Sequence, residues 1–333
     1  MEIGIAYDLK ADFEHLKSAS APDDALEEYD SIATVEGIER ALVARGHRVR
    51  RLGGGRNFVA AVLEAPPQLV FNISEGRGTR SREAHVPALC EMLGLPYTHS
   101  DPLTSALTLD KALAKRVVQS CGVPTPAFAV IERVEQLGDL ALRFPLFAKP
   151  LFEGSSMGIS RKSKLDDPAT CRERVAALLR DYGEPVLVEE YCSGAEFTVG
   201  VLGTGATARA ISAMEIVPKL VSRADFVYSL EVKRNWNWAE EVEYHVPPRR
   251  PAHEVAAIEK VALDAYRALG IRDVGRVDLR CDAGGTPKFI EANPLPGIAP
   301  GWSDLAILWE RTGRTHDQLI QAILDNACER LKL

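Results

Sequence analysis

The chain contains Gly275-Arg-Val-Asp-Leu-Arg280, followed closely by Pro287-Lys-Phe-Ile-Glu-Ala-Asn293. Polar and apolar residues alternate in both runs, as they do in a strand with one buried face. Asp282-Ala-Gly-Gly285 lies between them and is typical of a tight turn. The two runs therefore predict a β-hairpin.

The expected register of this hairpin brings polar side chains together. A four-residue turn implies that Cys281 pairs with Thr286. In that register Arg276 lies opposite Glu291, and Asp278 lies diagonal to Glu291. Period-2 alternation then gives a polar face of Arg276, Asp278, Glu291 and Asn293. The opposite, apolar face consists of Val277, Leu279, Ile290 and Ala292.

Two carboxylates and one amide on a single face suit Mg²⁺, which prefers oxygen ligands and usually keeps substrate phosphates in its shell. No His or Cys belongs to the set, which argues against zinc. A Pro- and Gly-containing loop, Pro294-Leu-Pro-Gly297, follows directly. The alternative is a solvated polar face, which is common in antiparallel sheets.

A candidate phosphate site lies earlier in the chain. Phe144-Pro-Leu-Phe-Ala-Lys149 is an apolar strand that ends in a lysine, and Glu153-Gly-Ser-Ser-Met-Gly158 follows it. Glycines allow tight turns in which successive N–H groups and hydroxyls wrap phosphate oxygens, and a lysine adds charge. The pattern is not a Walker loop, because no GxxxxGK[ST] occurs.

The N-terminal part, residues 1–100, alternates short apolar strands with helical segments. This rhythm predicts a doubly wound parallel sheet, so the fold class is α/β combined with α+β. Ligands of such sheets bind beyond the C-terminal strand ends, which here carry Tyr7-Asp8 and Asn72-Ile-Ser-Glu75.

Two further units are expected, a central one at 101–184 and a C-terminal one at 185–333. A single helix is predicted over Leu109–Cys121. Three consecutive, mutually antiparallel strands are predicted at Val186–Tyr191, Glu196–Leu202 and Ala210–Val217. A long polar segment, 218–245, has the length of a functional loop or lid. Its tryptophans Trp236 and Trp238 either shield a pocket or simply pack within the segment.

The overall composition excludes several functions. The 333 residues carry a net charge of −7, which argues against a nucleic-acid-binding face or a polybasic membrane patch. No apolar stretch approaches the length of a membrane span, and no signal peptide is recognisable. The six cysteines include no CxxC pair, as expected for reduced thiols in the cytoplasm.

Seven motifs recur in an order that resembles the D-alanine–D-alanine ligase branch of the ATP-grasp family. They are Gly94-Leu-Pro-Tyr-Thr98, Leu107-Thr-Leu-Asp-Lys111, Phe147-Ala-Lys149 with Glu153-Gly-Ser-Ser-Met-Gly158, Val186-Leu-Val-Glu-Glu190, Gly194-Ala-Glu-Phe-Thr198, Gly275-Arg-Val-Asp278, and Glu291-Ala-Asn293 with Pro296-Gly297. The resemblance spans residues 90–300 and implies an ATP-grasp fold with ATP held between the second and third domains.

The resemblance also implies roles for individual residues. ATP is expected to be contacted by Lys111, Lys149, Ser156, Glu189, Glu190, Tyr191 and Glu196. Two Mg²⁺ ions, or Mn²⁺ in their place, are expected on Asp278, Glu291 and Asn293. The expected catalytic residues are Ser155 in a closing loop, Lys233 in a second closing segment, and Arg276 beside the tetrahedral intermediate.

The implied chemistry is peptide-type ligation. ATP converts a carboxylate into an acyl phosphate, and an amine then displaces phosphate, so that the protein mainly positions groups and stabilises charge. The expected partners are a small-molecule carboxylate and an amine or amino acid. The resemblance further suggests a homodimer.

The chain departs from the family around the substrates. The first strand ends in Tyr7-Asp8-Leu-Lys10 without the family's Gly-rich loop, the HG motif is replaced by Asn72-Ile-Ser-Glu-Gly-Arg-Gly78, a tyrosine is replaced by Arg234, and a serine-containing stretch becomes Pro300-Gly-Trp-Ser303. The candidate substrate contacts are Asp8, Glu75, Arg80, Arg234, Gly297 and Trp302. Charged residues of the 75–82 segment are alternatively a solvated loop.

Three functions remain open at this point. The first is a ligase that joins substrates other than two D-alanines, with a genuine D-alanine–D-alanine ligase as its alternative. The second is an inactive nucleotide-binding regulatory protein, although no phosphate lysine or metal ligand is lost. The third is a kinase-like enzyme that releases an acyl phosphate.

Overall fold

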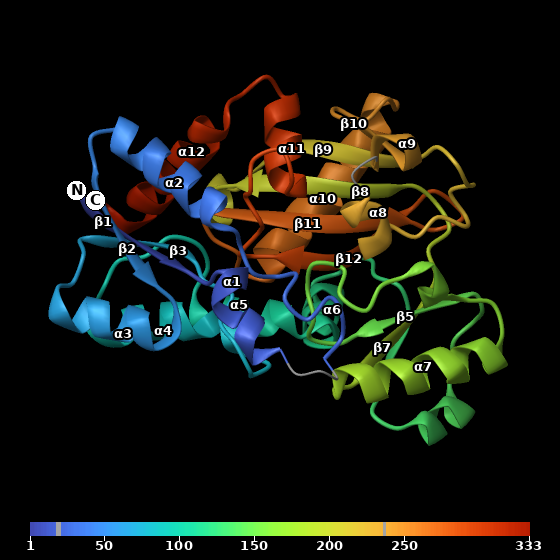
Figure 1. Cartoon of the computed structure of the whole chain (residues 1–333). Coiled ribbons are helices and arrows are strands. Elements are labelled where there is room, and N and C mark those ends of the chain that lie inside the picture. The colour runs from blue at the N-terminus through green and yellow to red at the C-terminus, as the bar shows by residue number, and fades with distance from the viewer. Residues whose placement is uncertain (18–20, 236–237) are drawn as a thin grey trace.

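The computed structural model describes residues 1–17, 21–235 and 238–333, and three β-sheets with covering helices form its framework (Figure 1). The strands are β1 (Glu2–Tyr7), β2 (Arg48–Gly53), β3 (Leu69–Ile73), β4 (Phe128–Ile131), β5 (Leu146–Pro150), β6 (Lys164–Leu165), β7 (Val186–Glu190), β8 (Glu196–Leu202), β9 (Arg209–Pro218), β10 (Val242–His245), β11 (Val274–Cys281) and β12 (Pro287–Asn293). The helices are α1 (Lys10–Phe13), α2 (Ile32–Ala44), α3 (Gly55–Glu64), α4 (His85–Leu93), α5 (Pro102–Leu109), α6 (Lys111–Ser120), α7 (Pro168–Tyr182), α8 (Leu230–Arg234), α9 (Trp238–Glu241), α10 (Ala252–Ala268), α11 (Asp304–Arg311) and α12 (His316–Leu331).

The N-terminal sheet is parallel, with strand order β2-β1-β3, as predicted. Both of its faces are buried, which explains the apolar character of β1 and β3. Ile3 and Ile5 share a core with residues of α2 and the C-terminal helix α12. Ala6 and Val70 share another core with α3 and α4. Helix α12 therefore packs against the N-terminal sheet, and segments from opposite ends of the sequence share one core.

The central sheet is antiparallel, with order β4-β7-β5-β6, and α7 covers one face. The expectation that 186–191 pairs with 196–202 is therefore wrong. Strand β7 lies between β4 and β5, and this sheet extends past residue 184. Three neighbouring apolar runs do not reveal which of them pair, because pairing depends on long-range contacts.

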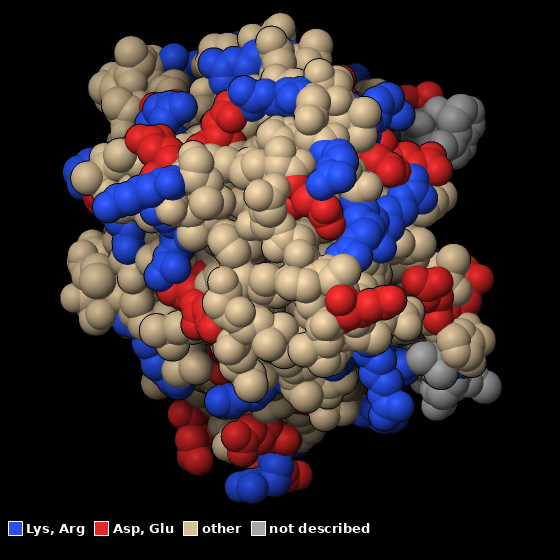
Figure 2. Space-filling model, turned by 90° about the vertical axis from the view of Figure 1, so that its left-hand side faces the viewer, with Lys and Arg blue, Asp and Glu red and all other residues tan. Residues whose placement is uncertain are grey.

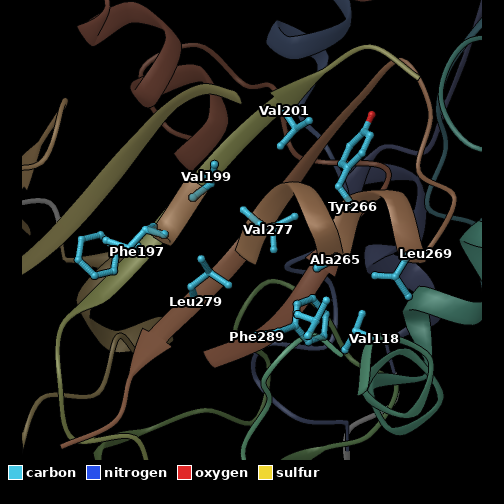
Figure 3. Close-up of a cluster of buried hydrophobic side chains, with 14 of the residues drawn as sticks. Val118, Phe197, Val199, Val201, Ala265, Tyr266, Leu269, Val277, Leu279 and Phe289 are labelled. Carbon is cyan, nitrogen blue, oxygen red and sulfur yellow. The ribbon is translucent and has the colours of Figure 1, made fainter. Parts of the chain in front are cut away.

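The C-terminal sheet has order β10-β9-β8-β11-β12 and is antiparallel throughout. Helix α10 packs on one face, where Tyr266 and Ala265 meet strand residues such as Val199 and Val277 (Figure 3). Phe289 of β12 joins this core. The opposite face of the predicted hairpin is thus free to carry polar groups.

Two expected elements differ in detail. The helix predicted over Leu109–Cys121 is α6, which begins at Lys111, while Leu109 ends the preceding helix α5. The Asp110 carboxylate accepts hydrogen bonds from the N–H groups of Ala112 and Leu113, so it starts a new helix. The polar segment 218–245 contains α8, α9 and β10. The prediction for Trp236 and Trp238 depends on side chains outside the described residues.

No helix within the described ranges is long and apolar enough to cross a membrane. Acidic and basic side chains are interspersed over the face of the molecule drawn in Figure 2. That face therefore offers no extended patch of a single charge.

Candidate active site

The β11–β12 hairpin carries the four predicted polar residues on one face, but its register differs from the prediction. Asp278 lies directly opposite Glu291, and Arg276 lies opposite Asn293. Cys281 pairs with Pro287, and the register shifts between Asp278 and Leu279. This bulge turns Phe289, instead of Ile290, into the hydrophobic core. The two carboxylates are consequently closer neighbours than expected.

Asp278 is surrounded by donors. Thr198 Oγ1 donates to its Oδ1 at 2.7 Å, Arg276 Nη2 lies 2.9 Å from its Oδ2, and Asn293 Nδ2 donates at 3.3 Å. Burial raises the pKa of Asp278, and the charge of Glu291 adds to the rise while Arg276 opposes it. The site thus holds two carboxylates at close range, compensated by one guanidinium.

Glu291 belongs to a chain of buried charges. Lys149 Nζ donates to Glu291 Oε2 at 3.2 Å and lies 3.5 Å from Glu189 Oε1. Lys115 Nζ lies 2.7 Å from the other oxygen of Glu189. Burial would raise the pKa of Glu291, but Lys149, Lys111 and Arg276 outweigh it and hold the pKa below its ordinary value. Positive and negative side chains therefore alternate along this row of ion pairs, in the order Lys115, Glu189, Lys149 and Glu291.

Lys115 was missed in the sequence. It is fully buried, and its pKa is lowered by burial while Glu189 opposes that change. Its ammonium also donates to Thr125 Oγ1 at 3.0 Å. The available signal was its position four residues after Lys111 on one helix, which places both lysines on the same face. Glu189 was expected to lie beside adenine. In the structure its carboxylate pairs with Lys115 and Lys149.

A narrow hollow of about 90 Å³ lies between the central and C-terminal sheets. It is lined in part by predicted ATP residues, namely Lys149, Ser156, Glu189, Glu190, Tyr191 and Glu196. Phe147 stacks against Tyr191, with ring centroids 6.2 Å apart. Glu196 pairs with Arg280 at 3.3 Å, and Glu190 pairs with Arg143 at 3.0 Å. The lining therefore combines an aromatic surface with the carboxylate of Glu196 and the ammonium of Lys149.

The Gly-Ser loop, residues 153–158, lies over the site in a tightly turned conformation. Ser155 and Ser156 have φ values of 47° and 61°, which side chains adopt rarely and mainly where surrounding structure enforces them. Lys111 Nζ donates to the Glu153 carbonyl oxygen. Gly158 also has a positive φ, and a Cβ there would lie 2.5 Å from Pro150. The loop is therefore held by specific contacts.

Residues 21–30, here termed the acidic loop, supply several of these contacts. The N–H of Gly154 donates to Glu28 at 2.5 Å, and the N–H of Gly158 donates to Asp24 at 2.8 Å. Glu28 in turn pairs with Arg82 at 2.6 Å, with both side chains largely buried. The acidic loop links the N-terminal sheet to the Gly-Ser loop, and no sequence motif indicated this role.

Helix α8 meets the same acidic loop. Arg234 pairs with Asp23 and with Glu27, the latter at 2.7 Å. Leu230 N donates to the carbonyl of Ile159, just past the Gly-Ser loop, at 3.4 Å. The two segments expected to close over ATP therefore touch each other and the acidic loop.

A larger cavity of about 500 Å³ opens between the N-terminal and C-terminal parts. Its lining includes the predicted residues Glu75, Lys111, Ser155, Lys233, Arg276, Glu291, Asn293, Gly297 and Trp302. Burial raises the pKa of Glu75, and Glu83 of the same wall has a pKa raised to about 7, again mainly by burial. Residues from the N-terminal and C-terminal parts of the sequence therefore line the same cavity.

Three predicted substrate residues do not line this cavity. Asp8 accepts hydrogen bonds from Ser74 Oγ at 2.5 Å and from Gly76 N at 2.9 Å, so it supports the 74–76 loop from beneath. The Arg80 side chain is 67% exposed and lies 4.0 Å from Asp110. Arg234 is held by the acidic loop. Asp8 and Arg234 are therefore engaged by groups of the protein, whereas most of the Arg80 side chain is exposed.

The chain is similar to known proteins over most of its length. A family model described as "D-ala D-ala ligase C-terminus" matches residues 117–325. The D-alanine–D-alanine ligase of Bordetella petrii is 32% identical over 299 residues, covering 89% of this chain and 87% of that protein. The uncharacterized protein y4sG of Sinorhizobium fredii is 33% identical over 311 residues, covering 89% and 87%. The crystal structure of a Bacillus anthracis D-alanine–D-alanine ligase superposes with a TM-score of 0.74 at 19% identity, covering 100% of this chain and 99% of that one, and confirms the predicted fold.

Proposed function

The chain belongs to the D-alanine–D-alanine ligase family of ADP-forming ATP-grasp ligases. We propose that it joins a carboxylate to an amine and that its two substrates are not both D-alanine. The observation that carries the proposal is the shared hairpin face of Arg276, Asp278 and Glu291, with Lys149 against it. The residues of this face belong to the family's motifs, whereas the segments 7–10 and 72–78 depart from the family's sequence pattern and contribute Lys10 and Glu75 to the larger cavity.

The substrate part of the proposal rests on that wall. The strand end at Asp8 is occupied by contacts within the protein, and the acidic loop supplies cavity residues of its own. Glu75 and Glu83 lie beside it with raised pKa values. A pocket for two small, identical amino acids does not require this many carboxylates. A genuine D-alanine–D-alanine ligase remains the alternative that assays must test.

The hairpin face fits magnesium. Among the described residues, no group of three or more His, Cys, Asp or Glu side chains is arranged to hold a metal ion. A metal here would instead use Asp278, Glu291 and the Asn293 amide, completed by nucleotide phosphates, which is the ligand pattern that Mg²⁺ favours. When bound, two Mg²⁺ or Mn²⁺ ions would neutralise phosphate oxygens. Their charge would also relieve the repulsion between the two carboxylates.

The residues then have distinct proposed roles. Lys111 and Lys149 would bind phosphate oxygens, and Tyr191, Glu190 and Glu196 would contact the nucleoside. Arg276 would stabilise the oxyanion that forms when the amine attacks the acyl phosphate. Ser155, Ser156 and Lys233, from the two segments that touch each other, would exclude water from that intermediate.

The proposal is tested by measuring ADP release with a matrix of carboxylates and amines. We expect release to require one acid and one amine together, with a condensed product detected by mass spectrometry. Turnover that requires D-alanine alone would support the D-alanine–D-alanine alternative. ATP binding without turnover on the whole matrix would favour an inactive regulatory protein, and an acyl phosphate released without amine would favour the kinase-like alternative.

We expect the acidic loop to couple ATP use to ligation. Asp24→Asn weakens the contact to Gly158 and Tyr182, so the Gly-Ser loop should open more often and admit water. The ratio of ADP released to product formed should rise roughly tenfold, as expected for loss of a charged hydrogen bond. Asp166→Asn, at a side chain 73% exposed, is the control. An unchanged ratio in Asp24→Asn would contradict this role.

A further inference from the structure

Asp304 is a buried carboxylate placed directly at the proposed reaction centre. It is the first residue of α11, is 7% exposed, and lines both the larger cavity and the narrow hollow. Its Oδ2 lies 3.5 Å from Lys233 Nζ and 3.6 Å from Arg276 Nη1. Tyr228 OH donates to its Oδ1 at 3.0 Å. Asp304 lies outside the seven family motifs of the chain.

These contacts determine which cationic side chains of the larger cavity are available to pair with a substrate carboxylate. Among the described residues, the cationic side chains lining the larger cavity are Lys10, Lys111, Lys233 and Arg276. Lys10 pairs with Glu27 at 2.8 Å, and Lys111 donates to the Glu153 carbonyl oxygen. Lys233 and Arg276 both lie against Asp304. Every cation of this wall therefore already has an acceptor in the protein.

The carboxyl groups lining the same cavity outnumber its cationic side chains. They are Glu27, Glu28, Asp30, Glu75, Glu83, Glu291 and Asp304. Burial raises the pKa of Asp304, but Lys233 and Arg276 outweigh it and hold the pKa below its ordinary value, so this carboxylate stays ionised near neutral pH. A second carboxylate brought beside it would meet repulsion in a desolvated space, where the two nearest cations, Lys233 and Arg276, already pair with Asp304.

We propose that Asp304 selects the acceptor, so that the attacking amine is an uncharged or cationic amine, such as an amino amide or a diamine, rather than an α-amino acid with a free carboxylate. The inference rests on the proposed function and deepens it. An acceptor carboxylate would have to displace Asp304 from Lys233 and Arg276. An amide can instead accept from them, and an added ammonium can pair with Asp304 itself.

Hydroxylamine separates the two halves of the reaction. As a small neutral amine it attacks an acyl phosphate, forming a hydroxamate and releasing phosphate, so hydroxamate formation with ATP identifies the donor acid. Acceptor pairs that differ only in the carboxylate are then offered at equal concentration with hydroxylamine. Suitable pairs are glycine with glycinamide, and each enantiomer of alanine with its amide. The readout is the ratio of condensed product to hydroxamate, measured by mass spectrometry.

We expect each amide to give a ratio at least about tenfold above that of its acid. In Asp304→Asn the preference should fall by about tenfold, because the freed Lys233 and Arg276 can then bind a carboxylate. Glu310→Gln, on the same helix and outside the cavity lining, should leave it unchanged. If Asp304→Asn does not fold, the wild-type ratios decide alone.

Two failures are distinguishable. Absence of hydroxamate with every acid would overturn the proposed function and the inference with it. Hydroxamate formation followed by equal or higher ratios for the free amino acids would overturn only the selection by Asp304.

Discussion

Replacing Asp278 by Asn should lower ADP release by about 1,000-fold, the loss expected when several kcal/mol of metal-assisted charge stabilisation disappear. Asn keeps the shape of the side chain, and its oxygen can still accept from Thr198 Oγ1 and Arg276 Nε, whereas its amide nitrogen cannot accept from Arg276 Nη2. It removes the negative charge that faces Glu291 across the hairpin. Steady-state ADP release at increasing Mg²⁺ concentration measures the effect, with far-UV circular dichroism reporting the fold.

The control for this variant lies in the same hairpin. Asp282→Asn keeps the oxygen that accepts from Gly284 N and Thr286 N in the turn, and it should retain near wild-type activity. Glu291→Gln should repeat the loss seen in Asp278→Asn. Full activity of both site variants in saturating ATP would eliminate the proposed metal ligands.

Replacing Lys115 by Met should destabilise the fold by about 3 kcal/mol, because it leaves a buried carboxylate with one partner fewer. Lys115 joins α6 to β7 through Glu189 at 2.7 Å and to β12 through the Phe289 carbonyl at 3.3 Å. Equilibrium urea unfolding measures the loss. The matched control is Lys260→Met, an exposed lysine paired with Asp264, which should cost under about 0.5 kcal/mol.

The double variant Lys115→Met with Glu189→Gln tests the cause. If the loss comes from an uncompensated charge, the double variant should be more stable than the sum of the single losses implies, by about 2 kcal/mol. Simple additivity would mean that Lys115 acts through packing alone.

Local patterns predicted most of the elements. The apolar runs of β1 and β3, bounded by turn residues, correspond to strands buried on both faces, and the parallel sheet follows from the helices between them. The pairing of the strands could not be predicted as well from the sequence. The apolar run of β7 pairs with β4 and β5, not with β8, and nothing local distinguishes these partners.

The candidate site was predicted where a two-residue repeat specifies it. Alternation put Arg276, Asp278 and Glu291 on one face, and this holds in the structure. The register did not follow. Cys281 pairs with Pro287 instead of Thr286, and the bulge at Ile290 adds a second residue, so that Arg276 lies opposite Asn293 instead of Glu291. A bulge depends on how Phe289 fills the core beneath α10, which is a long-range packing effect.

The sequence by itself determined the hairpin face, the lysine before the Gly-Ser loop and the family, because these depend on strand periodicity and on short motifs. Only the tertiary structure decided that Asp304 neutralises Lys233 and Arg276, and that the acidic loop holds both closing segments. Neighbours in those contacts are separated by 28 to 211 residues in the chain. Charges so distant in sequence meet only when three sheets pack around one cavity, and their mutual compensation then limits what the cavity can bind.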